Sequence, residues 1–346
     1  MKLLYLSCHS VLEYDEIKLF HELGIDVFSP GAYVEPSNPG DSTLRPSIPG
    51  LVYDPETLAE FHRIGQNFPG EDNKNHLTKE FVDRFDVVMV MHRSDWITGN
   101  WEAIKHKPII WRTIGQSVQQ IEEIITSYRK KGRIIIVRYS PLERVIPGFA
   151  GEDAVIRFYK DPADYGNWIG NEIKVITLAQ NMKARGRFMG YEHLLGATEG
   201  LERRIYGPTD PGSDTGVPGG RISFEELQNQ LRVSRAYLYT GTAPASYTLN
   251  FIEAWMTGIP VVALGRELGI IKDFREVPTY EVDRIIENGI TGYTGNTISE
   301  LKSKIKLLFD DWDHARQISQ AAREVAIAVF GKEKIRPEWE AFFKSL

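Results

Sequence analysis

Short apolar runs alternate with amphipathic stretches along most of the chain, and together they form two successive series. Such runs are typical of strands buried on both faces of a parallel sheet, and the stretches between them have the spacing of helices. Two blocks of alternating strands and helices predict two doubly wound α/β domains. We expect strands at 3–6, 27–28, 87–91, 109–111, 134–137, 174–178, 204–206, 236–239 and 260–263. We expect helices at 13–23, 117–128, 190–200, 223–231 and 247–257.

Proline and glycine interrupt a polar stretch at 160–170, where we expect the boundary between the two domains. The first domain then spans 1–165 and the second 166–330, followed by a tail, 331–346, in which Pro337 opens a short helix. This helix carries three aromatic side chains that need burial, so we expect it to pack back on the first domain. Sheets of this kind bind ligands at the carboxyl ends of their strands, and two that face one another create a cleft.

Two long segments show neither the apolar runs of buried strands nor the spacing of amphipathic helices. The segment 30–55 holds six of the 18 prolines and is too long for a simple connector. The segment 207–220 follows an expected strand and holds five glycines, which leaves it with little side-chain bulk. We see no internal sequence repeat beyond the repetition of two α/β halves.

The composition is that of a globular protein, with 42% hydrophobic and 25% charged residues. The net charge of −6, from 41 Lys and Arg against 47 Asp and Glu, argues against a dedicated duplex-binding protein. The single cysteine, Cys8, excludes a disulfide framework and a Cys-rich zinc module, and we expect it to be buried in the first strand. The sequence shows no signal-peptide pattern and no apolar run of membrane-spanning length, so we expect a cytoplasmic protein.

Most motifs that would identify a function are missing from the sequence. It contains no G-x-x-x-x-G-K-[ST] phosphate loop, no H-E-x-x-H metal motif and no G-x-S-x-G nucleophile elbow. Ser-Cys-His-Ser stands at 7–10, where a dinucleotide-binding domain would carry G-x-G-x-x-G after its first strand. A nicotinamide dehydrogenase and a kinase are therefore disfavoured.

The stretch 236–263 carries the most chemical information in the chain. An expected strand leads into a turn of small residues at 240–246, and the next helix is expected to begin near Tyr247. Because small residues let the backbone approach a ligand closely, the N–H groups at the start of this helix form a natural seat for a diphosphate. Glu253, farther along the helix, can accept hydrogen bonds from sugar hydroxyls. An ordinary βαβ unit with a solvated glutamate explains the same pattern equally well.

Glu-Ala-Trp-Met-Thr-Gly-Ile-Pro-Val-Val-Ala at 253–263 resembles the second half of the E-x7-E motif of retaining nucleotide-sugar glycosyltransferases of GT-B fold. Glu-Asn-Gly-Ile-Thr-Gly-Tyr at 287–293 resembles the E-D-G-x-T-G turn of the same family. The resemblance implies two facing Rossmann-like domains with a C-terminal helix that returns to the first. It also implies transfer of a sugar from a nucleoside diphosphate to a hydroxyl of a glycan, lipid, protein or small molecule. The reaction would proceed with retention at the anomeric carbon and without a metal or other cofactor.

The resemblance implies a donor site in the second domain. Glu253 corresponds to the family's second glutamate and is expected to hold the ribose. Ala245 stands where the family's first glutamate contacts the donor sugar, so that contact is lost or supplied by Ser246. Further donor-site residues are expected in the turn, at the start of the helix and at the glycine-rich segment beside the base: Gly207, Thr240, Gly241, Tyr247 and Thr248.

Three cations follow the first expected strand of the second domain, where the family carries an arginine and a lysine that hold the diphosphate. They are Lys183, Arg185 and Arg187, and Met189 occupies the position of the family's lysine. Arg185 and Arg187 are expected to stabilise the charge that develops on the leaving diphosphate. The alternative is a solvated basic turn.

Candidate residues of the first domain also stand at the ends of strands. His92 follows the strand at 87–91, where family members often place a histidine close to the donor sugar. His9, Arg93 and Arg112 are expected on the acceptor side. For His92 and His9, a purely structural role is the alternative.

Two other function classes remain open at this point. A nucleotide-sugar epimerase of the same fold would use the donor site without an acceptor. A non-catalytic nucleotide-sugar-binding protein is compatible with Ala245 and with the displaced basic pair.

Overall fold

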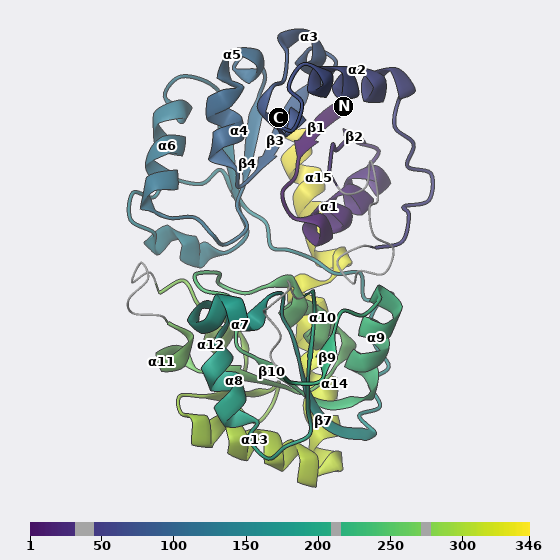
Figure 1. Ribbon diagram of the computed structural model, residues 1–346, viewed down its shortest axis with the longest axis vertical. Helices are drawn as coiled ribbons and strands as arrows, with labels where there is room; N and C mark the ends of the chain where they lie inside the picture. Colours follow the sequence, from purple (N-terminus) through teal and green to yellow (C-terminus); the bar gives the residue numbers. More distant parts are fainter. Residues whose placement is uncertain (32–44, 209–215, 271–277) are drawn as a thin grey trace. The chain divides into compact units, whose positions relative to one another are not determined.

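The computed structural model describes residues 1–31, 45–208, 216–270 and 278–346 (Figure 1). Its described residues divide into two compact units. Unit 1 comprises 1–31, 45–157 and 336–346, and unit 2 lies within 158–335, so the expected boundary at 165/166 falls inside unit 2. Half of the proline-rich segment, 32–44, lies outside the described residues, as do 209–215 of the glycine-rich segment.

Unit 1 is built on a sheet of six parallel strands in the order β2-β1-β3-β4-β5-β6. Every side chain of the central strand β3 is buried, which explains its unbroken apolar sequence. The strands expected in this half are confirmed, and β6 is an addition that the sequence pattern did not predict. The strands are β1 (Lys2–Leu6), β2 (Asp26–Phe28), β3 (Val87–Met91), β4 (Ile109–Arg112), β5 (Ile134–Arg138) and β6 (Ala154–Val155).

Helices cover the sheet of unit 1, and the two expected in this half are confirmed. Cys8 lies beyond the end of β1 with an exposed side chain, so the expectation that it is buried in a strand is wrong. The helices that begin and end within unit 1 are α1 (Ser10–Glu22), α2 (Pro55–Gln66), α3 (Lys79–Val82), α4 (Ser94–Gly99), α5 (Trp101–Ile104) and α6 (Gln119–Arg129). Short 3-10 helices lie at Asn73–Asn75 and Pro141–Val145.

Unit 2 repeats this architecture, with six parallel strands in the order β12-β11-β10-β7-β8-β9. The four strands expected here are confirmed, whereas β9 lies in the segment expected to be irregular and β12 was not predicted. Both α/β halves therefore have the doubly wound form that the alternation of strands and helices predicts. The strands are β7 (Glu172–Leu178), β8 (Arg203–Tyr206), β9 (Gly219–Gly220), β10 (Ser234–Tyr239), β11 (Val261–Leu264) and β12 (Tyr293–Gly295).

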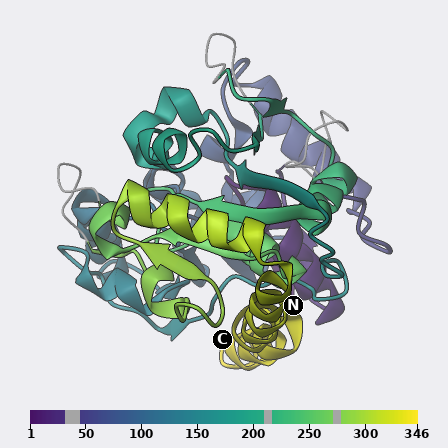
Figure 2. The same cartoon turned by 90° about the horizontal axis from the view of Figure 1, so that it is seen from below.

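The helix α10 (Leu249–Thr257) is almost entirely buried within unit 2, because it packs against α14 (Trp312–Phe330). It ends at Gly258, whose φ of 91° is the left-handed conformation that glycine adopts at helix ends. Figure 2 shows α13 (Ile298–Asp310) lying across the sheet, and this helix contacts β7, β10, β11 and β12. The other helices of unit 2 are α7 (Met182–Arg185), α8 (Tyr191–Ala197), α9 (Phe224–Val233), α11 (Arg266–Gly269) and α12 (Val282–Ile285).

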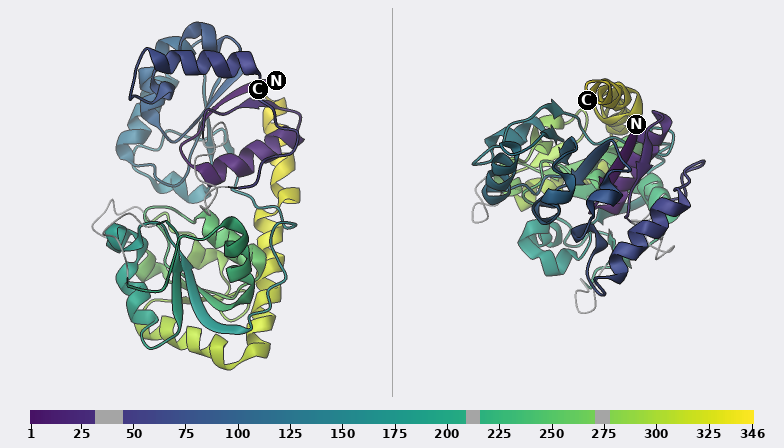
Figure 3. Two further views of the ribbon diagram at one scale, coloured as in Figure 1. Left: turned by 45° about the vertical axis from the view of Figure 1, so that its right-hand side comes forward. Right: turned by 90° about the horizontal axis from the view of Figure 1, so that it is seen from above.

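The last helix, α15 (Lys332–Lys344), buries the aromatic residues of the tail in unit 1. The rings of Trp339 and Phe343 each lie 4.9 Å from the ring of Phe20 on α1, and Trp339 is fully buried. Pro337 lies inside this helix rather than at its start, because the helix has already begun at Lys332. The two chain termini lie close together (Figure 3). No helix among the described residues is long and apolar enough to cross a membrane.

Candidate functional site

A turn of small residues follows β10 in unit 2, as the sequence predicts. Thr240 donates its hydroxyl proton to the carbonyl oxygen of Met189, 2.5 Å away, and the amide of Ala243 donates to the carbonyl oxygen of Phe188 at 2.8 Å. Gly241 has a φ of 76°, a conformation that favours glycine. The turn is therefore tied to the segment that leads into α8.

The three expected cations lie on α7 and on the 3-10 helix Gly186–Met189 that follows it. Lys183 and Arg187 are exposed and Arg185 is half-buried, and this burial lowers the pKa of the Arg185 guanidinium below its ordinary value. Only Arg187 of the three lines the pocket described next, and its guanidinium carbon lies 5.4 Å from the Phe188 ring.

A pocket lies at the carboxyl ends of β10 and β11, the edge where sheets of this type bind ligands. Gly190 lies so close to its neighbours there that an added Cβ would be 2.9 Å from Cβ of Thr240. The pocket is lined, among the described residues, by Arg187, Phe188, Gly190, 240–245, Leu264, 268–270, Thr279 and Tyr280. Thr240, Gly241 and Arg187 are thus brought together as the sequence predicts, and the contributions of Leu264, 268–270 and Tyr280 were missed. No short motif marks these residues, since their proximity follows from the order of strands in the sheet.

The helix α10 begins at Leu249, two residues later than expected, with Thr248 as its N-cap. The Thr248 hydroxyl donates to the hydroxyl of Tyr239 at 3.1 Å, and the side chain of Asn250 donates to the carbonyl oxygen of Leu178 at 2.6 Å. These bonds fix the start of α10 against the ends of β7 and β10.

Two residues expected at the donor site, Ser246 and Tyr247, are buried in unit 2. The ring of Tyr247 is 1% exposed and lies 5.8 Å from Phe158 and 5.2 Å from Phe330. Ser246 is fully buried, and its carbonyl oxygen accepts from the amide of Glu281 at 3.0 Å. Aromatic packing and a backbone contact therefore account for these two positions.

Glu253 lies on α10 with a side chain that is buried and hydrogen-bonded. Its carboxylate accepts from Nζ of Lys160 at 2.7 Å and from the hydroxyl of Tyr165 at 3.1 Å, and all three residues are buried. Sequence analysis missed both partners, since they lie about ninety positions away in the chain. A carboxylate this far from solvent is stable as an ion only because a cation and a hydroxyl face it. The expected ribose contact of Glu253 remains a prediction.

Gly207, expected beside the base, follows β8 and holds two strand ends close together. Its amide donates to the carbonyl oxygen of Gly220 at 2.9 Å, and its φ is 144°. A Cβ at this position would lie 2.3 Å from the carbonyl oxygen of Ala179, so only glycine fits.

In unit 1, His92 and Arg93 stand at the carboxyl end of β3, as expected. His92 has a left-handed backbone with a φ of 57°, and its ring lies 6.1 Å from that of Trp111. A non-glycine residue in this conformation is uncommon and is often found at a functional position. Arg93 is exposed and pairs with Asp95, which raises the pKa of the guanidinium.

The two other acceptor-side candidates have structural partners in unit 1. His9 is the N-cap of α1, where its Nδ1 accepts from the amide of Leu12 at 3.4 Å. Arg112 is fully buried, because its guanidinium donates to Glu16 and to the carbonyl oxygen of Ile156, both at 2.7 Å. The interior of unit 1 thus accounts for the charge of Arg112, which was expected on the acceptor side.

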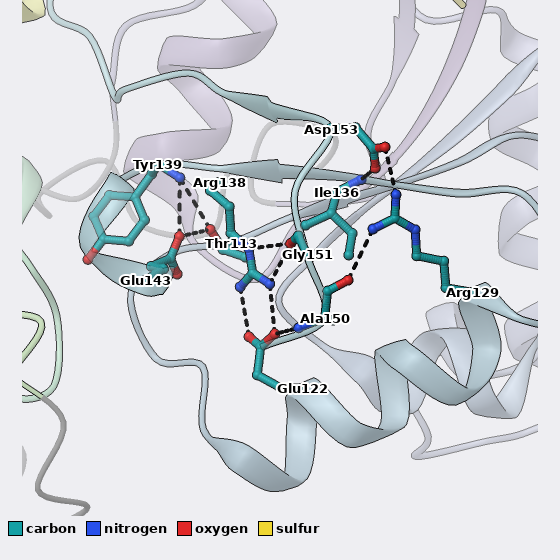
Figure 4. Close-up of polar contacts among 10 residues, drawn as sticks. All are labelled: Thr113, Glu122, Arg129, Ile136, Arg138, Tyr139, Glu143, Ala150, Gly151 and Asp153. Carbon is teal, nitrogen blue, oxygen red and sulfur yellow. Dashed lines mark hydrogen bonds and ion pairs between the residues drawn. The ribbon is translucent and has the colours of Figure 1, made fainter. Parts of the chain in front are cut away.

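A second buried charge cluster lies at the ends of β4 and β5 (Figure 4). Arg138 donates to both carboxylate oxygens of Glu122, each at 2.7 Å, and the Thr113 hydroxyl donates to Glu143 at 2.6 Å. Burial raises the pKa of the Glu143 carboxyl to about 7, and nearby Arg138 opposes this shift. Sequence analysis missed this cluster, because nothing in the pattern separates these charges from exposed ones.

The part of the chain that the structure describes holds no group of three or more His, Cys, Asp or Glu side chains arranged to bind a metal ion. No family model matches the sequence, and no curated protein matches it either.

Solved structures do match the whole fold. One is HepE from Anabaena in complex with UDP and glucose, with a TM-score of 0.68, 15% identity and coverage of 100% of both chains. Sucrose-phosphate synthase from Thermosynechococcus elongatus matches with a TM-score of 0.69 and 13% identity over 100% of this chain and 98% of that one. A glycosyltransferase from Rickettsia africae gives 0.65 and 15%, over 99% and 98%. The expected fold class is therefore confirmed, and the chain has the α/β GT-B fold over its full length.

Proposed function

We propose that the chain is a glycosyltransferase that moves a sugar from a nucleoside diphosphate to a hydroxyl acceptor. The observation that carries the proposal is the pocket of unit 2, where a turn of small residues at the carboxyl edge of the sheet adjoins Arg187. The full-length likeness to HepE, which was crystallised with UDP and glucose, supports the same proposal.

The main task of the protein in this sugar transfer is to stabilise the charge that develops on the leaving group. The bond from the anomeric carbon to the diphosphate oxygen breaks, and the bond from that carbon to the acceptor oxygen forms. The acceptor proton leaves with the released diphosphate. Negative charge grows on the leaving group, and a guanidinium together with backbone N–H groups is suited to stabilise it without a protein nucleophile. We propose retention at the anomeric carbon, metal independence and a catalytic role for His92 near the reacting centre as parts of the same hypothesis.

The first test is a thermal-shift screen against UDP, GDP, ADP and dTDP and their sugars. A ligand that binds only the folded chain raises its stability, so the donor nucleotide should stand out. With that nucleotide, we expect Arg187→Ala to weaken binding about tenfold to a hundredfold, because it removes a charge-assisted hydrogen bond to phosphate. Arg316→Ala is the matched control, since Arg316 is exposed on α14 and does not line the pocket.

Product analysis then separates the three function classes. A new glycoside with release of the nucleoside diphosphate, in the presence of EDTA, supports metal-independent transfer. Isomerised nucleotide sugar without transfer indicates an epimerase, and binding without turnover indicates a non-catalytic protein. No stabilisation by any of the nucleotides, or equal affinity of Arg187→Ala and the unaltered chain, would contradict the assignment of the pocket.

A further inference from the structure

Among the described residues, the chain passes from one unit to the other after Arg157 and again after Ile335. The segment that follows the first passage, 158–165, is here called the joining segment. It lies beside the end of α14, because the amide of Lys160 donates to the carbonyl oxygen of Phe330 at 2.9 Å. The two stretches of chain that enter and leave unit 2 at these passages are therefore tied to each other.

The joining segment also holds the middle of α10. Lys160 and Tyr165 both donate to the same carboxylate oxygen of Glu253, at 2.7 and 3.1 Å, and all three residues are buried. A buried carboxylate depends strongly on such partners, because they replace the hydration that it has lost. Any movement of α10 that shifts Glu253 therefore acts directly on the joining segment.

Two further contacts connect the joining segment with the two ends of α10. The ring of Tyr247, just before the helix, lies 5.8 Å from that of Phe158. At the other end, Arg323 of α14 donates to the carbonyl oxygens of Met256 and of Pro162, the latter at 3.1 Å. The joining segment is thus linked to α10 near its start, at its middle and near its end.

The start of α10 is continuous with the turn that lines the pocket of unit 2. This part of the lining ends at Ala245, three residues before the N-cap Thr248. The hydroxyl of Thr248 donates to that of Tyr239 at the end of β10, 3.1 Å away. Because packed interiors transmit small displacements, a ligand that fixes this turn also restrains α10.

We propose that Lys160 and Tyr165 are positioning residues: through Glu253 they couple nucleotide binding in the pocket to the order of the joining segment. The inference rests on the proposed function and adds a way in which donor binding regulates a segment outside the pocket. A bound nucleotide restrains the turn and α10, the carboxylate of Glu253 stays in place, and the joining segment opens less often. Couplings between two sites typically change an equilibrium by about fivefold or more.

The test is hydrogen–deuterium exchange on the full-length protein, with and without a saturating nucleoside diphosphate. The probe is the compound among UDP, GDP, ADP and dTDP that stabilises the chain most. We expect amides of the joining segment, including that of Lys160, to exchange about fivefold or more slowly when it is bound. Slower exchange at 240–248 with no change at 158–165 would overturn this inference and leave the proposed function intact. Binding by none of the four nucleotides would instead remove the proposed function.

Two variants test whether the coupling passes through Glu253. Lys160→Met/Glu253→Met removes the polar link without leaving a buried charge unpaired, and methionine side chains are flexible. We expect the slowing at 158–165 to fall severalfold in this variant and the slowing at 240–248 to persist. Tyr165→Phe removes one donor and leaves the carboxylate in place, so it should give an intermediate response.

Lys302→Met is the matched control, because it removes a partly exposed cation on α13 of the same unit and should retain the full response. If the double variant no longer binds nucleotide, Tyr165→Phe decides the question, since its carboxylate is unchanged. A full response of the joining segment in Tyr165→Phe and in every double variant that binds would contradict the proposal.

Discussion

Both sheets consist of six parallel strands, but the side chains at their carboxyl edges differ in kind. In unit 1, the polar side chains at the end of β4 are buried and bonded inside the unit: Arg112 donates to Glu16, and the Thr113 hydroxyl donates to Glu143. In unit 2, the residues after β10 are small, and they leave a pocket with Arg187 at its lining. The comparison shows that charged residues at strand ends can face partners inside the unit, whereas small side chains let the backbone line a pocket.

The largest expected effect tests whether the charges of unit 1 are structural. Arg138→Met leaves the buried carboxylate of Glu122 without its cation, and we expect the free energy of unfolding to fall by about 3–5 kcal/mol. Arg144→Met is the matched control, since the Arg144–Glu152 pair lies at the surface of the same unit and should matter little. Urea denaturation of both variants gives the comparison. A small loss in Arg138→Met would show that the buried pair is dispensable.

An effect of similar size is expected for the buried pair of unit 2. Lys160→Met removes the cation that faces the buried carboxylate of Glu253 and should also lose about 3–5 kcal/mol, whereas the double variant Lys160→Met/Glu253→Met should recover most of that loss. Denaturation midpoints measure this recovery of stability. The nucleotide affinity of the double variant tests separately whether Glu253 contacts the ligand. If Glu253 only anchors α10, the refolded double variant binds as the unaltered chain does. A large loss of affinity would instead support the expected ribose contact.

The next effect concerns how the stability of unit 1 depends on pH. Burial raises the pKa of Glu143 from 4.5 to about 7, so between these values the folded chain keeps a proton that the unfolded chain has lost. This group therefore contributes its full stabilisation to the folded state below pH 4.5. The free energy of unfolding then falls by about 3 kcal/mol as the pH rises from 4.5 to 7, and it changes no further above pH 7. Glu143→Gln should remove this dependence, so its stability relative to the unaltered chain should rise from pH 5 to pH 8. Glu123→Gln on the exposed face of α6 should show no such trend.

The smallest expected effect tests whether the close packing of Gly190 against Thr240 in the pocket of unit 2 matters for stability. Gly190 and Gly200 both have a positive φ, 63° and 73°, so alanine at either should lose about 1–2 kcal/mol. A Cβ at Gly190 also meets Thr240, whereas a Cβ at Gly200 meets nothing within 4 Å. We therefore expect Gly190→Ala to lose more stability than Gly200→Ala and to weaken nucleotide binding. Equal losses in thermal unfolding would show that the close approach at Gly190 is unimportant.

Much of the fold was accessible from the sequence because local patterns encode it. The apolar runs located nine strands, and the Gly-Ile-Pro segment marked the end of α10, where Gly258 adopts the left-handed conformation. The two-residue strands β6 and β9 and the short strand β12 have too few residues to form a pattern, and pairing with a neighbour creates them. The prediction that Cys8 is buried in the first strand was wrong because β1 ends at Leu6 and the chain turns toward α1 at Cys8.

The sequence by itself determined the two α/β halves and the turn after β10, because periodicity and small side chains act over a few neighbouring residues. Only the tertiary structure decided which charges face a pocket and which face each other. The partner of Glu253 on α10 is Lys160, and that of Arg112 is Glu16. Burial and pairing of charges depend on contacts between residues far apart in the chain, and no local pattern carries that information.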